Sequence, residues 1–131
     1  MLIDASALTA ILVGEAGAPG LATRMRRGRP LRTSPVAAWE TSVAVVRILG
    51  LRVPAATRAV FDYLRAAEIE LAAVPPEAAT LAIEAFDRYG KGRHPAQLNI
   101  GDCFAYACSR HFGEPLLFKG ADFPRTDIEP A

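Results

Sequence analysis

The chain has 131 residues, 51% of them hydrophobic, and its formal net charge at pH 7 is +1. This length suits a single domain, residues 1–131, that buries roughly two-thirds of the surface exposed by the unfolded chain. The even balance of charge excludes a strong overall attraction to nucleic acid. No run approaches the ~20 apolar residues of a membrane span, and the first residues lack the pattern of a signal peptide.

The two cysteines favour a cytoplasmic location. Cys103 and Cys108 lie five positions apart on one predicted helix, and this spacing turns their side chains to divergent faces. A disulfide between them is therefore unfavourable, and two cysteines alone do not complete a zinc site. We expect both to be buried free thiols, which suit a reducing compartment.

Short apolar runs alternate with helical patterns along the chain. The predicted strands are residues 1–4, 31–34, 69–74 and 115–118. The predicted helices are residues 6–15, 19–27, 36–49, 54–67, 77–89 and 99–113. Such alternation predicts an α/β fold, a three-layer α/β/α sandwich with a central parallel sheet of four or five short strands.

Two of these helices, 36–49 and 54–67, are expected to form an antiparallel pair. Val43 and Phe61 lie on it and are candidates for a surface that binds a partner or a second copy, although ordinary core packing is the simpler explanation. In the helix 77–89, the apolar positions predict a partly buried face that contains Ala78, Leu81, Ile83 and Phe86.

Two acids in the last third of the chain lie where ligand sites form in parallel sheets. A helix is expected from the N-cap Asn99 to Gly113. Asp102 lies in its first turn, and Asp122 follows the buried strand 115–118. In open α/β sheets, sites form beyond the carboxyl ends of the strands, where helices begin. Both acids therefore belong to the expected site.

Two more acids occupy similar positions earlier in the chain. Asp4 ends the first strand, and Glu40 shares a helix face with Val36, Val43 and Ala44. A carboxylate on an apolar face needs a partner, because burying it alone is costly. The architecture brings four such acids to one end of the sheet, and the expected partner is a divalent metal ion. The four are Asp4, Glu40, Asp102 and Asp122.

Mg²⁺ or Mn²⁺ suits a site made of carboxylates, because these ions take oxygen ligands and keep several waters. Such ions activate water for in-line displacement, so no side chain has to act as the nucleophile. The sequence is compatible with one such ion or with two. Capping and solvation explain Asp102 taken alone, but they do not explain Glu40.

Other polar residues have simpler explanations. Ser6 either orients Asp4 or contacts a metal-bound water, or it caps the first helix. Asn99 is expected to be a cap rather than a ligand. His94 and His111 are not expected to be catalytic, because neither has a positioned partner. Five arginines crowd one stretch and are expected to form a solvated face, with an RNA phosphate or an acidic partner as the second use. They are Arg24, Arg26, Arg27, Arg29 and Arg32.

The motifs that contain the acids match a known family. They are Leu-Ile-Asp-Ala-Ser at 2–6, Trp-Glu at 39–40, LNIGDCFAYA at 98–107 and PLLFKGADFPRTDI at 115–128. With them the chain resembles the PIN-domain nucleases and is more closely similar to the VapC-type toxins of bacterial toxin–antitoxin pairs. The similarity covers nearly the whole chain, and residues 98–128 are its most specific part.

The resemblance implies an activity and partners. The chain is expected to be a Mg²⁺- or Mn²⁺-dependent endoribonuclease that forms a homodimer and is held inactive by a cognate antitoxin protein. By the resemblance, Asp4 and Asp102 hold the principal ion, and Glu40 and Asp122 complete the site directly or through water. Asp127 matches the family pattern and is expected to close the edge strand.

Three other classes of protein share parts of this pattern. A receiver-like signalling domain would want adjacent acids after the first strand, whereas Asp4 stands alone before Ala5 and Ser6. A dinucleotide-binding domain would want a Gly-x-Gly-x-x-Gly loop there. A catalytically silent PIN-like module that binds RNA or a protein partner remains the main alternative, although the presence of all four acids disfavours it.

Overall fold

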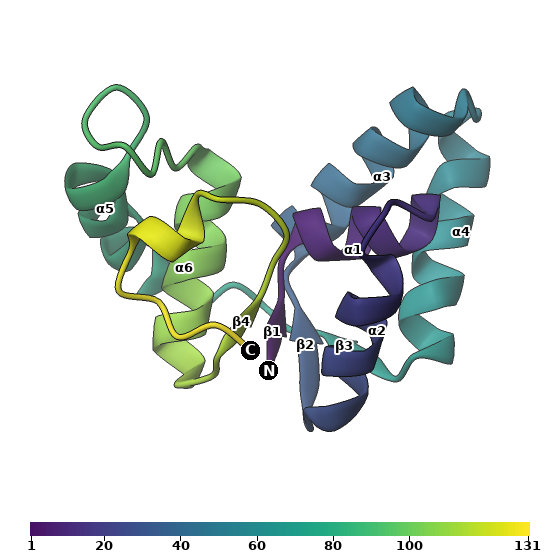
Figure 1. The fold of residues 1–131 in the computed structure, drawn as a ribbon, viewed down its shortest axis with the longest axis horizontal. Coiled ribbons are helices and arrows are strands. Elements are labelled where there is room, and N and C mark those ends of the chain that lie inside the picture. Colours follow the sequence, from purple (N-terminus) through teal and green to yellow (C-terminus); the bar gives the residue numbers. More distant parts are fainter.

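A short parallel sheet lies in the middle of the computed structural model, which describes all residues 1–131 (Figure 1). Its strand order is β3-β2-β1-β4, and every neighbouring pair is parallel. The strands are β1 (Leu2–Ile3), β2 (Leu31–Thr33), β3 (Ile69–Leu71) and β4 (Leu116–Leu117). The predicted parallel sheet of four or five strands is thus confirmed with four.

Helices cover both faces of this sheet and complete the predicted α/β/α sandwich (Figure 1). One face packs against α1 (Ala5–Val13), α2 (Ala18–Arg27), α3 (Pro35–Leu49) and α4 (Val53–Ala66). The other packs against α5 (Ala78–Tyr89), α6 (Ile100–Phe112) and the 3₁₀ turn η1 (Phe123–Arg125).

The two residues of β1 belong to different hydrophobic cores, one on each face of the sheet. Leu2 belongs to the cluster with α5 and α6, whereas Ile3 belongs to the cluster with α1 to α4. Successive strand side chains point to opposite faces, so both must be apolar when helices cover both faces. This explains why β1 and β4 consist only of leucine and isoleucine.

The buried face of α5 differs from the prediction. Ala78, Ala82 and Ala85 are buried, whereas Ile83 is 69% exposed and Phe86 is 46% exposed. Small side chains allow α5 to approach α6 closely, and the larger apolar residues are left on the outer side. The partial burial predicted for this face holds for Leu81 and Phe86 but was wrong for Ile83.

Strand β3 and the two cysteines bear on two further expectations. The strand predicted for 69–74 is shorter and ends at Leu71. Cys103 and Cys108 are buried and free, as expected. None of the helices is long and apolar enough to cross a membrane.

Candidate active site

Polar side chains from both halves of the chain line one cavity of ≈ 450 Å³ beyond the carboxyl ends of β1 and β4. The sheet and α1 supply one part of its wall, α3 another, and the start of α6 a third. The cavity brings together three of the four predicted acids. Its polar lining residues are Asp4, Ser6, Thr9, Glu15, Glu40, Asn99, Asp102 and Lys119.

Asp4 is buried and held in a fixed orientation. It is the N-cap of α1, a position for which Ser6 was the candidate expected from the sequence. The Ser6 backbone N–H and hydroxyl both donate to Asp4 Oδ2, at 2.9 and 2.5 Å. Ser6 therefore orients the Asp4 carboxylate, and Asp4 rather than Ser6 caps the helix. Burial raises the pKa of Asp4, although the hydrogen bonds from Ser6 oppose the rise.

Asp102 is anchored by a capping box at the start of α6. Asn99 caps the helix as expected: the Asp102 backbone N–H donates to Asn99 Oδ1 at 3.1 Å. The Asn99 backbone N–H in turn donates to Asp102 Oδ2 at 2.8 Å. Burial raises the pKa of Asp102 to about 6, and the charges of Asp4 and Asp122 add to the rise.

Glu40 reaches the cavity because α6 has a glycine opposite it. A Cβ atom on Gly101 would overlap both carboxylate oxygens of Glu40, so the absence of a side chain there makes the space for this group. Ala37, Thr41 and Val45 form the buried face of α3, and Glu40 lies at its edge, half-buried. Ala44 lines the cavity together with Glu40, as expected for residues on one helix face, whereas Val43 is exposed.

The pKa of the Glu40 carboxylate also depends on the charges of the other acids. Burial raises the pKa of Glu40 to about 7, and the charges of Asp4 and Asp102 contribute to this rise. No side-chain hydrogen bond offsets these effects. The charge of Asp4 raises the pKa values of both Glu40 and Asp102, and the charge of Asp102 raises that of Glu40, so the three carboxylates form one electrostatically coupled group.

Asp122 lies at the margin of this group. It is exposed, precedes η1, and does not line the cavity. Its charge nevertheless contributes to the raised pKa of Asp102. The structure therefore brings Asp4, Glu40 and Asp102 together and leaves Asp122 beside them.

The chemistry of these donors fits Mg²⁺ or Mn²⁺. In the arrangement of the structure, no three Asp, Glu, His or Cys side chains are grouped closely enough to hold an ion by themselves. Mg²⁺ usually takes one or two carboxylates and fills its other positions with water, so a pair of direct ligands is sufficient. Asp4 and Asp102 are the two acids that hydrogen bonds already orient.

Comparison with known proteins shows the family to which the chain belongs. A model of the PIN domain matches residues 1–129. The chain belongs to the PIN-domain family. Ribonuclease VapC42 of Mycobacterium tuberculosis is 40% identical over 133 residues, which cover 100% of this chain and 98% of that protein. Ribonuclease VapC of Mycolicibacterium smegmatis is 42% identical over 129 residues, with 98% and 97% covered.

These relatives place this PIN domain among the VapC ribonucleases, so the expected family and enzyme class are confirmed. The crystal structure of VapC20 of M. tuberculosis, described as a sarcin–ricin loop cleaving toxin, has the same fold. The superposition covers 99% of this chain and 97% of the VapC20 chain, with a TM-score of 0.76. Its sequence identity of 20% limits that likeness to the fold.

Several polar groups of the PIN domain lie outside the site. His94 accepts a hydrogen bond from the Ala96 N–H, and neither histidine lines the acidic cavity. Asp127 lies in no strand, contrary to expectation, and accepts hydrogen bonds from the Tyr106 hydroxyl at 2.7 Å and from Arg88 at 3.1 Å. Asp127 thus ties the C-terminal segment to α5 and α6.

The arginine-rich stretch lies at the amino ends of the strands, whereas the acids lie at their carboxyl ends. Arg24, Arg27 and Arg29 line a hollow there together with Met1 and Pro115. Arg32 is not part of a solvated face, because it pairs with the carboxylates of Glu70 and Glu114. The fold therefore does not direct this stretch towards the acidic cavity.

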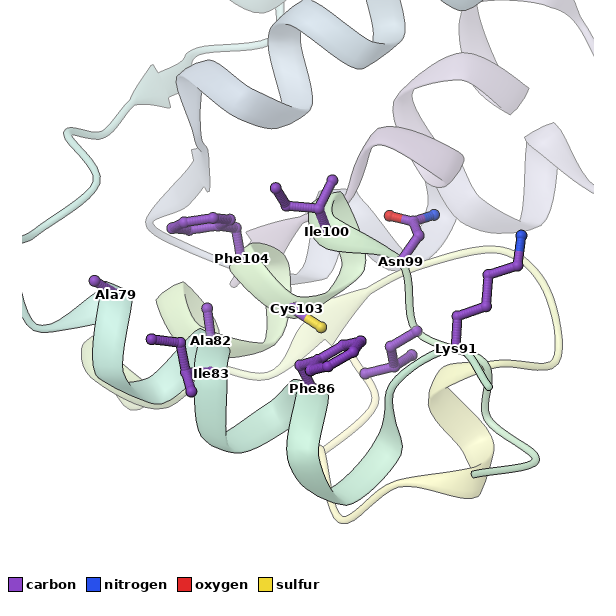
Figure 2. Close-up of a pocket in the computed structure, with 10 residues that line it drawn as sticks. Ala79, Ala82, Ile83, Phe86, Lys91, Asn99, Ile100, Cys103 and Phe104 are labelled. Atoms are coloured by element: carbon purple, nitrogen blue, oxygen red, sulfur yellow. The ribbon is translucent and has the colours of Figure 1, made fainter. Parts of the chain in front are cut away.

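A second cavity, of ≈ 590 Å³, lies between α5 and α6 and is almost entirely apolar (Figure 2). Phe86, Phe104 and Ile83 line it from the two helices, and Lys91 lies at its edge. Asn99 lines both this cavity and the acidic one. Ala79 and Ala82 of α5 line the apolar cavity as well.

Three polar lining residues of the acidic cavity were not anticipated: Thr9, Glu15 and Lys119. Lys119 comes directly after the buried run of β4, so the rule that sites form at the carboxyl ends of strands could have found it. Glu15 follows the end of α1 and has no comparable signal.

Gly101→Ala should lower cleavage by this ribonuclease about tenfold or more without destabilising it. The added Cβ displaces the Glu40 carboxylate, and small displacements at a site reduce rates strongly. Alanine in place of a helical glycine ordinarily adds about 0.5–1 kcal/mol of stability, so the melting temperature should stay constant or rise. Rates and thermal melts measure both effects.

Gly20→Ala is the matched control. Gly20 is helical too, and a Cβ atom there meets nothing within 4 Å. It should leave the cleavage rate unchanged. Full activity of Gly101→Ala would show that the space opposite Glu40 is not needed.

Proposed function

We propose that this chain is the toxin of a toxin–antitoxin pair and cleaves RNA internally with the help of Mg²⁺ or Mn²⁺. The observation that carries the proposal is the cavity in which Asp4, Glu40 and Asp102 are coupled. Kinship with the VapC ribonucleases supports RNA as the substrate. The free buried thiols suit action in the cytoplasm.

Each acid has a distinct part in this proposal. Asp4 and Asp102 would hold the principal ion, and Glu40 and Asp122 would complete the site directly or through water. The bound ion would activate a water and neutralise charge on the phosphodiester. Ser6 fixes the rotamer of Asp4, and the capping box fixes that of Asp102, so these side chains lose little freedom when an ion binds.

Incubation of the purified chain with total cellular RNA, with and without Mg²⁺, tests this function. Attack by activated water should leave 5′-phosphate and 3′-hydroxyl ends, because the ribose 2′-oxygen is not the nucleophile. End mapping of the products checks this. Cyclic phosphate ends, or full activity in a chelator, would overturn the proposal.

The antitoxin should meet the site through charge and apolar contact. A cavity lined by acids attracts a basic side chain, so an antitoxin Arg or Lys is expected to point towards Asp4, Glu40 and Asp102. Its apolar segment is expected in the hollow between α3 and α4, lined by Trp39, Val43, Val46 and Val53, beside the exposed Phe61. A complex structure with an empty acidic cavity would reject this.

A homodimer is the third part of the proposal. The face around the α5–α6 cavity exposes Ile83, Phe86 and Ile100, the last by 76%. Large exposed apolar patches commonly mark protein interfaces, and a second copy would cover this one. Light scattering of the chain alone measures the state, and a monomer at tens of micromolar would contradict it.

A further inference from the structure

One basic side chain lines the acidic cavity. Lys119 follows β4, and it is the single cation among lining residues that include Asp4, Glu15, Glu40 and Asp102. Its ammonium group pairs with the Glu15 carboxylate, which lies just beyond the end of α1. It makes no pair with the three coupled acids.

The backbone of Lys119 is fixed to the site while its side chain is half-exposed. The Lys119 N–H donates to Ser6 Oγ at 2.9 Å, and the Ser6 hydroxyl donates to Asp4 Oδ2. The side chains of Lys119 and Glu15 are 40% and 36% exposed. A long flexible side chain on a fixed base can exchange one anionic partner for another without moving the fold.

We propose that Lys119 binds the phosphate of the RNA substrate, and that Glu15 holds its ammonium group aside until the RNA arrives. This rests on the proposed function. The cavity repels a phosphodiester, since it contains four acids and one base. A bound metal ion would neutralise part of that charge, and Lys119 supplies a further positive charge from the protein itself. On RNA binding, the ammonium group leaves Glu15 for a non-bridging phosphate oxygen.

The pairing with Glu15 has a second consequence. An ammonium group paired with Asp4 or Asp102 would compete with the metal ion for the same carboxylates. Because Glu15 engages Lys119 at the rim, the carboxylates that would hold the ion stay available. Glu15 is thus a positioning residue, whereas Lys119 contacts the substrate.

Single substitutions of the two partners separate this role from an ordinary surface ion pair. Lys119→Gln should lower kcat/KM for RNA by about 10- to 100-fold, the size of a lost hydrogen bond to a charged group. Lys119→Arg should restore part of it. Glu15→Gln releases the ammonium group and should keep or improve kcat/KM. A structural ion pair predicts instead that both partners lose activity to the same degree.

The affinity of the metal site for Mn²⁺, measured by calorimetry in the absence of RNA, provides a second readout. Lys119→Gln removes a positive charge beside the acids, so Mn²⁺ should bind equally well or a few-fold more tightly while cleavage falls. Lys91→Gln is the control, because Lys91 is the only other lysine of the chain and also precedes a glycine. It should alter neither measurement.

Three outcomes would overturn the assignment. Cleavage by Lys119→Gln within twofold of the unaltered chain excludes a phosphate contact. Equal losses in Lys119→Gln and Glu15→Gln indicate a structural ion pair. Failure of the unaltered chain to cleave RNA in the same assay overturns the proposed function first, and the role of Lys119 with it.

Discussion

Replacing Asp4 by asparagine should lower the rate of RNA cleavage by at least about 100-fold, more than the loss typical of residues that only support a metal ligand. Asp4 is the most deeply buried of the acids, 3% exposed, and its charge raises the pKa values of both Glu40 and Asp102. Asparagine has the same shape but lacks the negative charge that would hold the ion. The rate with labelled RNA in Mg²⁺ measures the effect.

The fold should survive this change. Asparagine is as good an N-cap as aspartate, and its carbonyl oxygen can accept the hydrogen bond from the Ser6 N–H. Asp62→Asn makes the same chemical change at an exposed position of α4 and should leave the rate unaltered. Undiminished cleavage by Asp4→Asn would leave the silent binding module as the better description of this chain.

The layered fold and the convergence of the acids could be predicted because their signals are local. Apolar runs such as Leu116–Leu117 mark strands that are buried on both faces, and Gly113 marks a helix end by its left-handed φ of 63°. Once the strands are known to be parallel, Asp4 and Asp102 fall at the same end of the sheet. The capping box of Asn99 and Asp102 is local as well.

Features that depend on packing between distant elements could not be predicted. In α5, alanines and large apolar residues alternate, and periodicity alone favours the larger ones for the core. The close approach of α6 selects Ala82 and Ala85 instead, which exposes Ile83. Likewise, the need for glycine at position 101 depends on Glu40, which lies in another helix. Lys119 pairs with Glu15, which is 104 positions away in the sequence.

Glu40→Gln should raise the melting temperature of the metal-free protein at pH 8 while impairing cleavage. The Glu40 carboxylate has no compensating hydrogen bond and lies near Asp4 and Asp102, so its charge destabilises the folded state when no cation is present. A pKa raised to about 7 from 4.5 corresponds to about 3 kcal/mol at most. Because the side chain is half-exposed, we expect about 1 kcal/mol, or roughly 3–6 °C.

The effect should disappear in acid, and the sign follows from the two pKa values. The unfolded glutamate titrates near 4.5 and the folded one near 7, so between these values the folded state binds more protons. The free energy of unfolding therefore falls as the pH rises from about 4.5 to 7. Below 4.5, Glu40 is protonated in both states, and the glutamine variant should have no advantage. Melting in EDTA from pH 4.5 to pH 8 traces this difference.

Metal and matched variants complete the test. Mg²⁺ should raise the melting temperature of the unaltered chain at pH 8, since a ligand that binds only the folded state stabilises it. Asp102→Asn should gain less than Glu40→Gln in EDTA, because Asp102 also accepts the capping hydrogen bond from Asn99. Glu84→Gln, at an exposed position of α5, should change nothing. An advantage of Glu40→Gln that persists at pH 4.5 would mean that packing, rather than repulsion between carboxylates, sets the stability of this site.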